Sequence, residues 1–106
     1  MTVLRAPTYY WTVNEVPRDL PGHELVSAGL LDLAAGRETE ASLVVAMAAP
    51  RLRALGFDVP PSGAAQPGHR LYELLSEHDG GAHSRYNALV GRMVSFARAA
   101  EHAPSR

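Results

Sequence analysis

The sequence predicts an all-α fold, a four-helix bundle with an extended aromatic arm at its N-terminus, in a single helical domain over residues 1–106. Apolar residues recur at helical spacing in four segments, and Gly- and Pro-containing stretches separate them. Only one short run, Thr-Tyr-Tyr-Trp-Thr-Val at residues 8–13, is rich in strand-favouring residues. Because an isolated strand is not stable, this run is assigned to an extended arm over residues 1–20.

The first helix is predicted from about Pro21 to Ala35. Proline suits the first helical position, Glu24 falls in the positively polarised first turn, and Gly36 is a natural residue just beyond the C-terminus. The predicted buried face consists of Val26, Leu30, Leu33 and Ala34, widened by Leu25 and Leu31.

The second helix is predicted to begin near Thr39, a good N-cap, and to end at Gly56. Its first half is apolar nearly all round, a pattern typical either of a central helix surrounded by others or of a face buried in a dimer. Pro50 lacks a backbone N–H and clashes with the preceding turn, so a kink or break is expected there.

A Pro/Gly-rich linker over residues 58–68 then leads to a third helix, predicted from about Pro67 to His78. The fourth helix is predicted from an N-cap at Ser84 to about Glu101. Its apolar stripe has the most regular helical spacing in the chain and comprises Tyr86, Leu89, Val90, Met93, Phe96, Ala97 and Ala100.

Composition removes several classes of chemistry. The chain has no cysteine and no lysine, since all ten basic residues are arginine, so thiolate nucleophiles, disulfides, lysine Schiff bases and P-loops are excluded. No Gly-x-Ser-x-Gly element occurs either. We therefore predict no catalytic residue, no cofactor and no cofactor-binding residue, and favour a binding protein over an enzyme.

The expected setting follows from charge and hydropathy. The net charge of −1 creates no global field towards DNA or a membrane. The start has no continuous apolar run typical of a signal peptide, and the longest apolar run, residues 43–50, is too short to span a membrane. We therefore expect a cytoplasmic protein. The absence of lysine and isoleucine beside abundant Ala, Arg, Gly and Pro is typical of a GC-rich bacterial genome.

The weak candidates for a metal site are His69, Glu73, His23 and His83. His69 and Glu73 stand four residues apart on one helix face, and imidazole with carboxylate is a usual ligand set for zinc, manganese or iron. Another helix would have to supply the remaining ligands, and His23 or His83 is a candidate for that. The competing interpretation is a solvated polar face, because no HExxH element is present.

The interface candidates are Tyr9, Tyr10, Trp11, Leu43 and Met47, since Tyr and Trp are enriched at interfaces and the second helix carries an apolar excess. The aromatic residues can equally cap the chain's own core. The favoured function is a small interaction or regulatory module that self-associates, as a homodimer or larger homo-oligomer, or binds a partner protein through apolar helix faces.

Two alternatives stay open. One is a small metal-dependent enzyme that uses the histidine and glutamate residues above. The other is a DNA-associated regulator, for which Arg85 and Arg92 lie seven residues apart on one face of the fourth helix. Since acidic and basic residues are nearly equal in number, nucleic acid is not the favoured partner.

Overall fold

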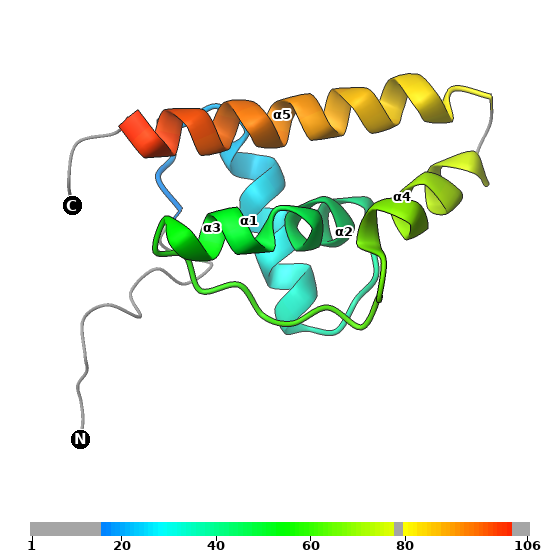
Figure 1. Cartoon of the computed structure of the whole chain (residues 1–106), viewed down its shortest axis with the longest axis horizontal. Helices are drawn as coiled ribbons and strands as arrows, with labels where there is room; N and C mark the ends of the chain where they lie inside the picture. The colour runs from blue at the N-terminus through cyan, green and yellow to red at the C-terminus, as the bar shows by residue number, and fades with distance from the viewer. Residues whose placement is uncertain (1–15, 78–79, 103–106) are drawn as a thin grey trace.

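A computed structural model describes residues 16–77 and 80–102, and within these ranges the fold is all-α, with no strand (Figure 1). The described helices are α1 (His23–Ala34), α2 (Glu40–Met47), α3 (Ala49–Ala54), α4 (Pro67–Ser76) and α5 (Ala82–His102). The predicted second helix is divided into α2 and α3. Most of the predicted N-terminal arm lies outside the described residues.

Helix α1 begins two residues later than Pro21, the predicted first residue. Its N-cap is Gly22, which has a φ of +79°. A Cβ atom at Gly22 would lie 2.9 Å from the Arg92 carbonyl oxygen of α5, so this turn requires both a left-handed backbone and the absence of a side chain. At the other end Gly36 has a φ of +75°, as expected of the residue that follows a helix C-terminus.

The start of α2 confirms Thr39 as N-cap. The Thr39 hydroxyl accepts a hydrogen bond from the Ser42 backbone N–H (3.0 Å), and the Ser42 hydroxyl accepts one from the Thr39 N–H (2.8 Å). This reciprocal capping box satisfies two backbone donors that the helix itself cannot satisfy.

The helix breaks at Ala48, two residues before the predicted position at Pro50. A proline ring collides with the carbonyl group one turn earlier, so the distortion falls in the turn before the proline rather than on it. Pro50 itself lies in the first turn of α3, where a missing N–H leaves no hydrogen bond unmade.

Helices α4 and α5 follow the crossover that contains the linker. Helix α4 ends at Ser76, two residues short of the predicted end, and His78 lies outside the described residues. Helix α5 starts at Ala82, so Ser84 is inside the helix instead of capping it. In Figure 1, α5 runs along the upper edge of the molecule and α1 passes behind the pair formed by α2 and α3.

Helix α2 is the centre of the core, because it packs against α1, α4 and α5. This arrangement explains why its first half is apolar nearly all round. The tightest approach is at Gly29 of α1, where a Cβ atom would lie 2.5 Å from the Ala41 carbonyl oxygen and closer still to a Val45 methyl group. The largest side chains that are fully buried are Phe96, Leu30, Leu43, Leu52, Leu71 and Leu75.

Part of the face of α1 that was predicted to be buried is exposed in the structure. Val26, Leu30 and Leu33 are buried as expected, whereas Leu31 is 49% exposed. Ala34 is also exposed. Both lie on the solvent-exposed side of α1.

Candidate functional site

An open, mainly apolar groove of about 260 Å³ lies between α2–α3 and α5. Its lining residues are Val44, Met47, Ala48 and Arg51 on one side and Val90, Met93, Val94 and Ala97 on the other. Seven of these eight side chains are apolar, and only Arg51 is charged. We call this feature the α2–α5 groove.

Each wall of the α2–α5 groove follows the same helical spacing of i, i+3, i+4 and i+7. On α5 this spacing places the four residues on one helix face, whereas the other wall continues from α2 across the break at Ala48 to Arg51 of α3. Val44, Met93 and Ala97 are buried, while Met47, Val90 and Val94 are partly exposed. The groove therefore presents apolar surface to its opening as well as to the core. Two parallel walls of this kind match the outline of a third helix.

Ion pairs connect the two sides of the α2–α5 groove. Arg51 of α3 contacts Glu101 of α5, with its Nη2 atom 2.8 Å and its Nε atom 3.0 Å from Glu101 Oε2. Arg85 near the start of α5 contacts Glu40 at the start of α2, with 3.1 Å between Nη2 and Oε2. One pair joins the start of α2 to the start of α5 and the other joins α3 to the end of α5, so the two walls run in the same direction.

Two methionines contribute to the groove, Met47 and Met93. An unbranched thioether side chain adapts its shape to a neighbour more readily than a β-branched one. Met47 also lies near the α4 N-terminus, since its Cε and Sδ atoms are 3.4 and 3.6 Å from the position that a Cβ atom on Gly68 would take. The flexible lining makes the groove suited to a protein side-chain surface rather than to one rigid small molecule.

The interface residues predicted from the sequence do not form one surface among the described residues. Tyr9, Tyr10 and Trp11 lie outside the described residues. Leu43 is 1% exposed, so its side chain belongs to the chain's own core and cannot reach a partner in this arrangement. Met47 lines the α2–α5 groove.

Sequence reasoning missed the wall that α5 contributes. Val90 and Val94 of that wall are half-buried. Val90 belongs to the apolar stripe predicted for the last helix, and Val94 falls at the edge of that stripe. The available signal was the width of the apolar face of α5, which extends from Phe96 round to Val94 and exceeds what one packed neighbour covers.

The candidate metal ligands are distributed over the surface. His69 Nε2 lies 3.2 Å from Glu73 Oε2 on the exposed side of α4. His23 Nε2 lies 3.7 Å from Glu24 Oε2 at the start of α1, and His83 Nε2 lies 3.2 Å from Asn87 Nδ2 on α5. Within residues 16–77 and 80–102 no group of three or more His, Cys, Asp or Glu side chains is placed to hold a metal ion. The structure thus brings together His69 and Glu73 but not the predicted set.

The arginines considered for DNA binding have acidic neighbours. Arg85 pairs with Glu40, and Arg92 Nη2 lies 4.0 Å from Glu24 Oε1. A carboxylate beside each guanidinium lowers the positive potential that phosphate groups would require.

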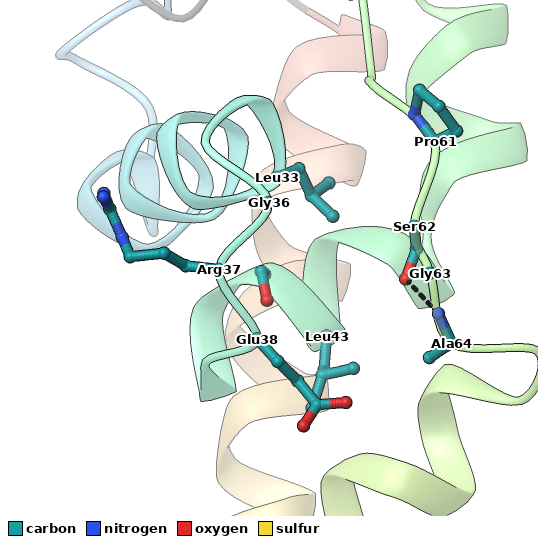
Figure 2. A pocket seen from close by; sticks show the side chains of 10 residues that line it. Leu33, Gly36, Arg37, Glu38, Leu43, Pro61, Ser62, Gly63 and Ala64 are labelled. Atoms are coloured by element: carbon teal, nitrogen blue, oxygen red, sulfur yellow. Dashed lines mark hydrogen bonds between the residues drawn. The ribbon is translucent and has the colours of Figure 1, made fainter.

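A second, smaller hollow of about 110 Å³ lies between the α1–α2 turn and the crossover (Figure 2). Leu33, Glu38 and Leu43 face it from one side, and Pro61 to Ala64 face it from the other. Its polar groups are engaged elsewhere: the Ser62 hydroxyl accepts a hydrogen bond from the Ala64 N–H, and Glu38 accepts one from Arg70. The volume is below the range of about 300–1,000 Å³ that small-molecule sites occupy.

Asp32, at the end of α1, is the electrostatic centre of the α1–α2 turn. Its carboxylate accepts hydrogen bonds from the Thr39 hydroxyl (2.6 Å) and from the Arg37 guanidinium (2.9 Å to Nη2). These contacts, led by the one to Thr39, lower the pKa of Asp32 below its ordinary value. The network fixes the turn that carries the N-cap of α2, so its role is structural.

Comparison of the chain with protein-family models, curated proteins and solved structures yields no significant match. In the part of the chain that the structure describes, no helix combines the length and the apolar character that crossing a membrane requires. The functional argument therefore depends on the geometry of the α2–α5 groove.

Proposed function

We propose that this chain is a small self-associating protein-interaction module, and that the α2–α5 groove receives a helix of a second copy. The observation that carries the proposal is the open apolar groove with two helical walls at i, i+3, i+4 and i+7 spacing. Recognition of a helix by such a groove depends on burial of apolar anchors at the same spacing. The net charge of −1 supports the proposal, because two copies of the chain repel each other little.

The apolar excess of α2, from which self-association was first predicted, is mostly used inside the fold. What remains for a partner is the Met47 and Ala48 edge of the groove together with Val90 and Val94. In the proposed module α2 and α3 count as one bent helix of a four-helix bundle. The aromatic arm with Tyr9, Tyr10 and Trp11 is kept as a second contact surface that the groove does not require.

Sedimentation velocity over a concentration series tests the proposal. The wild-type chain is expected to show a reversible dimer. Val94→Asp places a carboxylate on the groove wall, where burial by a partner would remove it from water, so dimerisation should weaken by at least about tenfold. Ala88→Asp adds the same charge to an exposed position of α5 outside the groove and should leave the dimer unchanged.

Thermal unfolding of both variants, followed by circular dichroism, checks that each is folded. Val90→Ala is a milder second variant that removes two methyl groups from the same wall without adding charge. A wild-type chain that stays monomeric at every concentration would contradict the proposed function. A dimer that Val94→Asp and Val90→Ala both leave intact would contradict the role of the groove.

A further inference from the structure

We infer that Met47 is a modification site: a peroxide oxidises its thioether to a sulfoxide, and the sulfoxide draws the side chain out of the α2–α5 groove. The effect on association rests on the proposed function, whereas the site itself rests on the surroundings of the Met47 sulfur atom. Three observations carry the inference. They are the distribution of sulfur in the chain, the exposure of this side chain, and a space beside it that suits an added oxygen atom.

Sulfur in the described part of the chain is confined to the α2–α5 groove. The sequence has no cysteine and three methionines, of which Met1 lies outside the described residues. The other two, Met47 and Met93, both line the groove. Because there is no thiol to react first, an oxidant that attacks sulfur acts on these thioethers.

The two groove methionines differ in exposure. Met93 is 5% exposed, so an oxidant reaches its sulfur atom only when the structure opens locally. Met47 is partly exposed, at the end of α2. Access decides between two thioethers of the same intrinsic reactivity, so Met47 should react first.

The reaction is a two-electron oxidation of sulfur. A lone pair of Met47 Sδ attacks one oxygen atom of hydrogen peroxide, so that an S–O bond forms and the O–O bond breaks. The second oxygen leaves as hydroxide and takes the proton from the transferred oxygen, which gives water and the sulfoxide. A flexible apolar side chain thereby becomes a polar one, and methionine sulfoxide reductases reverse the step.

A space beside the Met47 sulfur atom can receive the added oxygen. It lies where a Cβ atom on Gly68 would be, 3.6 Å from Met47 Sδ, 3.4 Å from Met47 Cε and 3.3 Å from the Tyr86 hydroxyl oxygen. The Tyr86 hydroxyl has no hydrogen-bond partner among residues 16–77 and 80–102. A thioether is only a weak acceptor, whereas a sulfoxide oxygen accepts well, so oxidation supplies this hydroxyl with an acceptor.

The fold therefore accommodates the sulfoxide, while the groove loses a contact. A hydrogen bond from Tyr86 offsets the cost of removing the new oxygen from water, so the packing around α2 stays intact. The same hydrogen bond holds the Met47 side chain towards α4. A partner that buries apolar anchors in the groove then lacks the adaptable side chain on one wall, and association weakens.

Peptide mapping after treatment with dilute hydrogen peroxide tests the selectivity of the site. In the folded chain Met47 should be oxidised at least about tenfold faster than Met93, and in concentrated urea the two should react alike. Equal rates in the folded chain would overturn the inference.

Urea unfolding of the reduced and oxidised protein tests the space beside the sulfur atom. The parent chain carries Met93→Leu, a volume-conserving change that leaves Met47 as the oxidisable groove residue. Oxidation should leave its folding equilibrium constant nearly unchanged. Tyr86→Phe removes the donor and Gly68→Ala fills the space, so in either variant oxidation should lower that constant about fivefold. Gly91→Ala, whose added methyl group meets nothing within 4 Å, is the matched control and should behave as the parent chain does.

Sedimentation velocity of the Met93→Leu chain tests the effect on association. Oxidation should weaken dimerisation about tenfold, and a methionine sulfoxide reductase should restore it. Met47→Leu keeps an apolar side chain of similar volume, so this variant should remain a dimer in the presence of peroxide. Met1 is present in both chains, so any contribution from its oxidation appears in both.

The outcomes separate the inference from the proposed function. If the dimer ignores oxidation of Met47, or if oxidation destabilises the parent chain as much as the Tyr86→Phe chain, the inference is overturned and self-association stands. A chain that is monomeric at every concentration rejects the proposed function and the effect on association, while the oxidation rates and the unfolding data still decide whether Met47 is the site. Selective oxidation that the fold tolerates only with Tyr86 and Gly68 in place supports the site.

Discussion

The close contact between α1 and α2 predicts that Gly29→Ala destabilises the fold although alanine is the better helix former. Replacing glycine by alanine inside a helix gains about 1 kcal/mol in helix propensity. At Gly29 the new methyl group would lie 2.5 Å from the Ala41 carbonyl oxygen and closer still to Val45, so the two helices must separate. Overpacking of this kind costs about 1–3 kcal/mol, and a contact with rigid backbone falls at the upper end.

The net expectation is a loss of about 1–2 kcal/mol in the free energy of unfolding. Gly91→Ala is the matched control, because the same substitution on α5 meets nothing within 4 Å. It should gain about 0.5–1 kcal/mol. The two variants thus change stability in opposite directions, and their melting temperatures should differ by about 10 °C or more in a domain of this size.

The measurement is urea-induced unfolding followed by far-ultraviolet circular dichroism, at a protein concentration low enough that self-association does not contribute. The midpoint should shift down for Gly29→Ala and up for Gly91→Ala, with unchanged slopes. If Gly29→Ala were as stable as Gly91→Ala, α1 and α2 would not approach at this point, and the reasoning would be refuted.

Two further predictions concern the turn and the core. The depressed pKa of Asp32 stabilises the fold above the ordinary carboxyl pKa, and this stabilisation is lost as the pH falls through the folded-state value. Thr39→Ala should therefore lower the free energy of unfolding by about 1 kcal/mol at neutral pH and by less in acid, whereas Thr39→Ser should retain the wild-type pH dependence. Denaturant unfolding at several pH values measures this. If the hydroxyl did not act on Asp32, the difference in stability between wild type and Thr39→Ala would be the same at every pH. Phe96→Ala should cost about 3–5 kcal/mol of the free energy of unfolding, because the side chain is fully buried with its ring centroid 5.6 Å from that of Phe57. Tyr72→Ala, at a site that is 40% exposed, should cost about 1 kcal/mol. Similar losses for the two variants in denaturant unfolding would contradict the assigned core.

Local signals in the sequence predicted most of the secondary structure. The N-cap at Thr39 and the glycine after α1 act within one turn of the chain, so their residue types suffice to place them. The position of the helix break was less well predicted. Pro50 signals a distortion in the turn that precedes it, but which residue of that turn leaves the helix depends on how Ala48 and its neighbours pack.

The groove could not be predicted from local pattern. Its walls come from residues as far apart in the sequence as Met47 and Val94, and no periodicity shows that α3 and α5 lie on either side of one depression. An apolar stripe also does not reveal how much of it a neighbour covers. Leu43 and Met47 illustrate this, since both belong to the same apolar segment and only Met47 reaches the surface.

The crossover between α3 and α4 is anchored more firmly in its first half than around Gly63. Phe57 and Val59 are buried, and the Val59 carbonyl oxygen accepts two hydrogen bonds from Arg53, whereas a Cβ atom on Gly63 would meet nothing within 4 Å. The second half of this connection is therefore a place where the chain can be cut, lengthened or fused to another polypeptide. Loop closure costs only about 0.6 kcal/mol more for each doubling in length, so an insertion after Gly63 should leave both helices in place. The same insertion before Phe57 would pull an aromatic anchor out of the core.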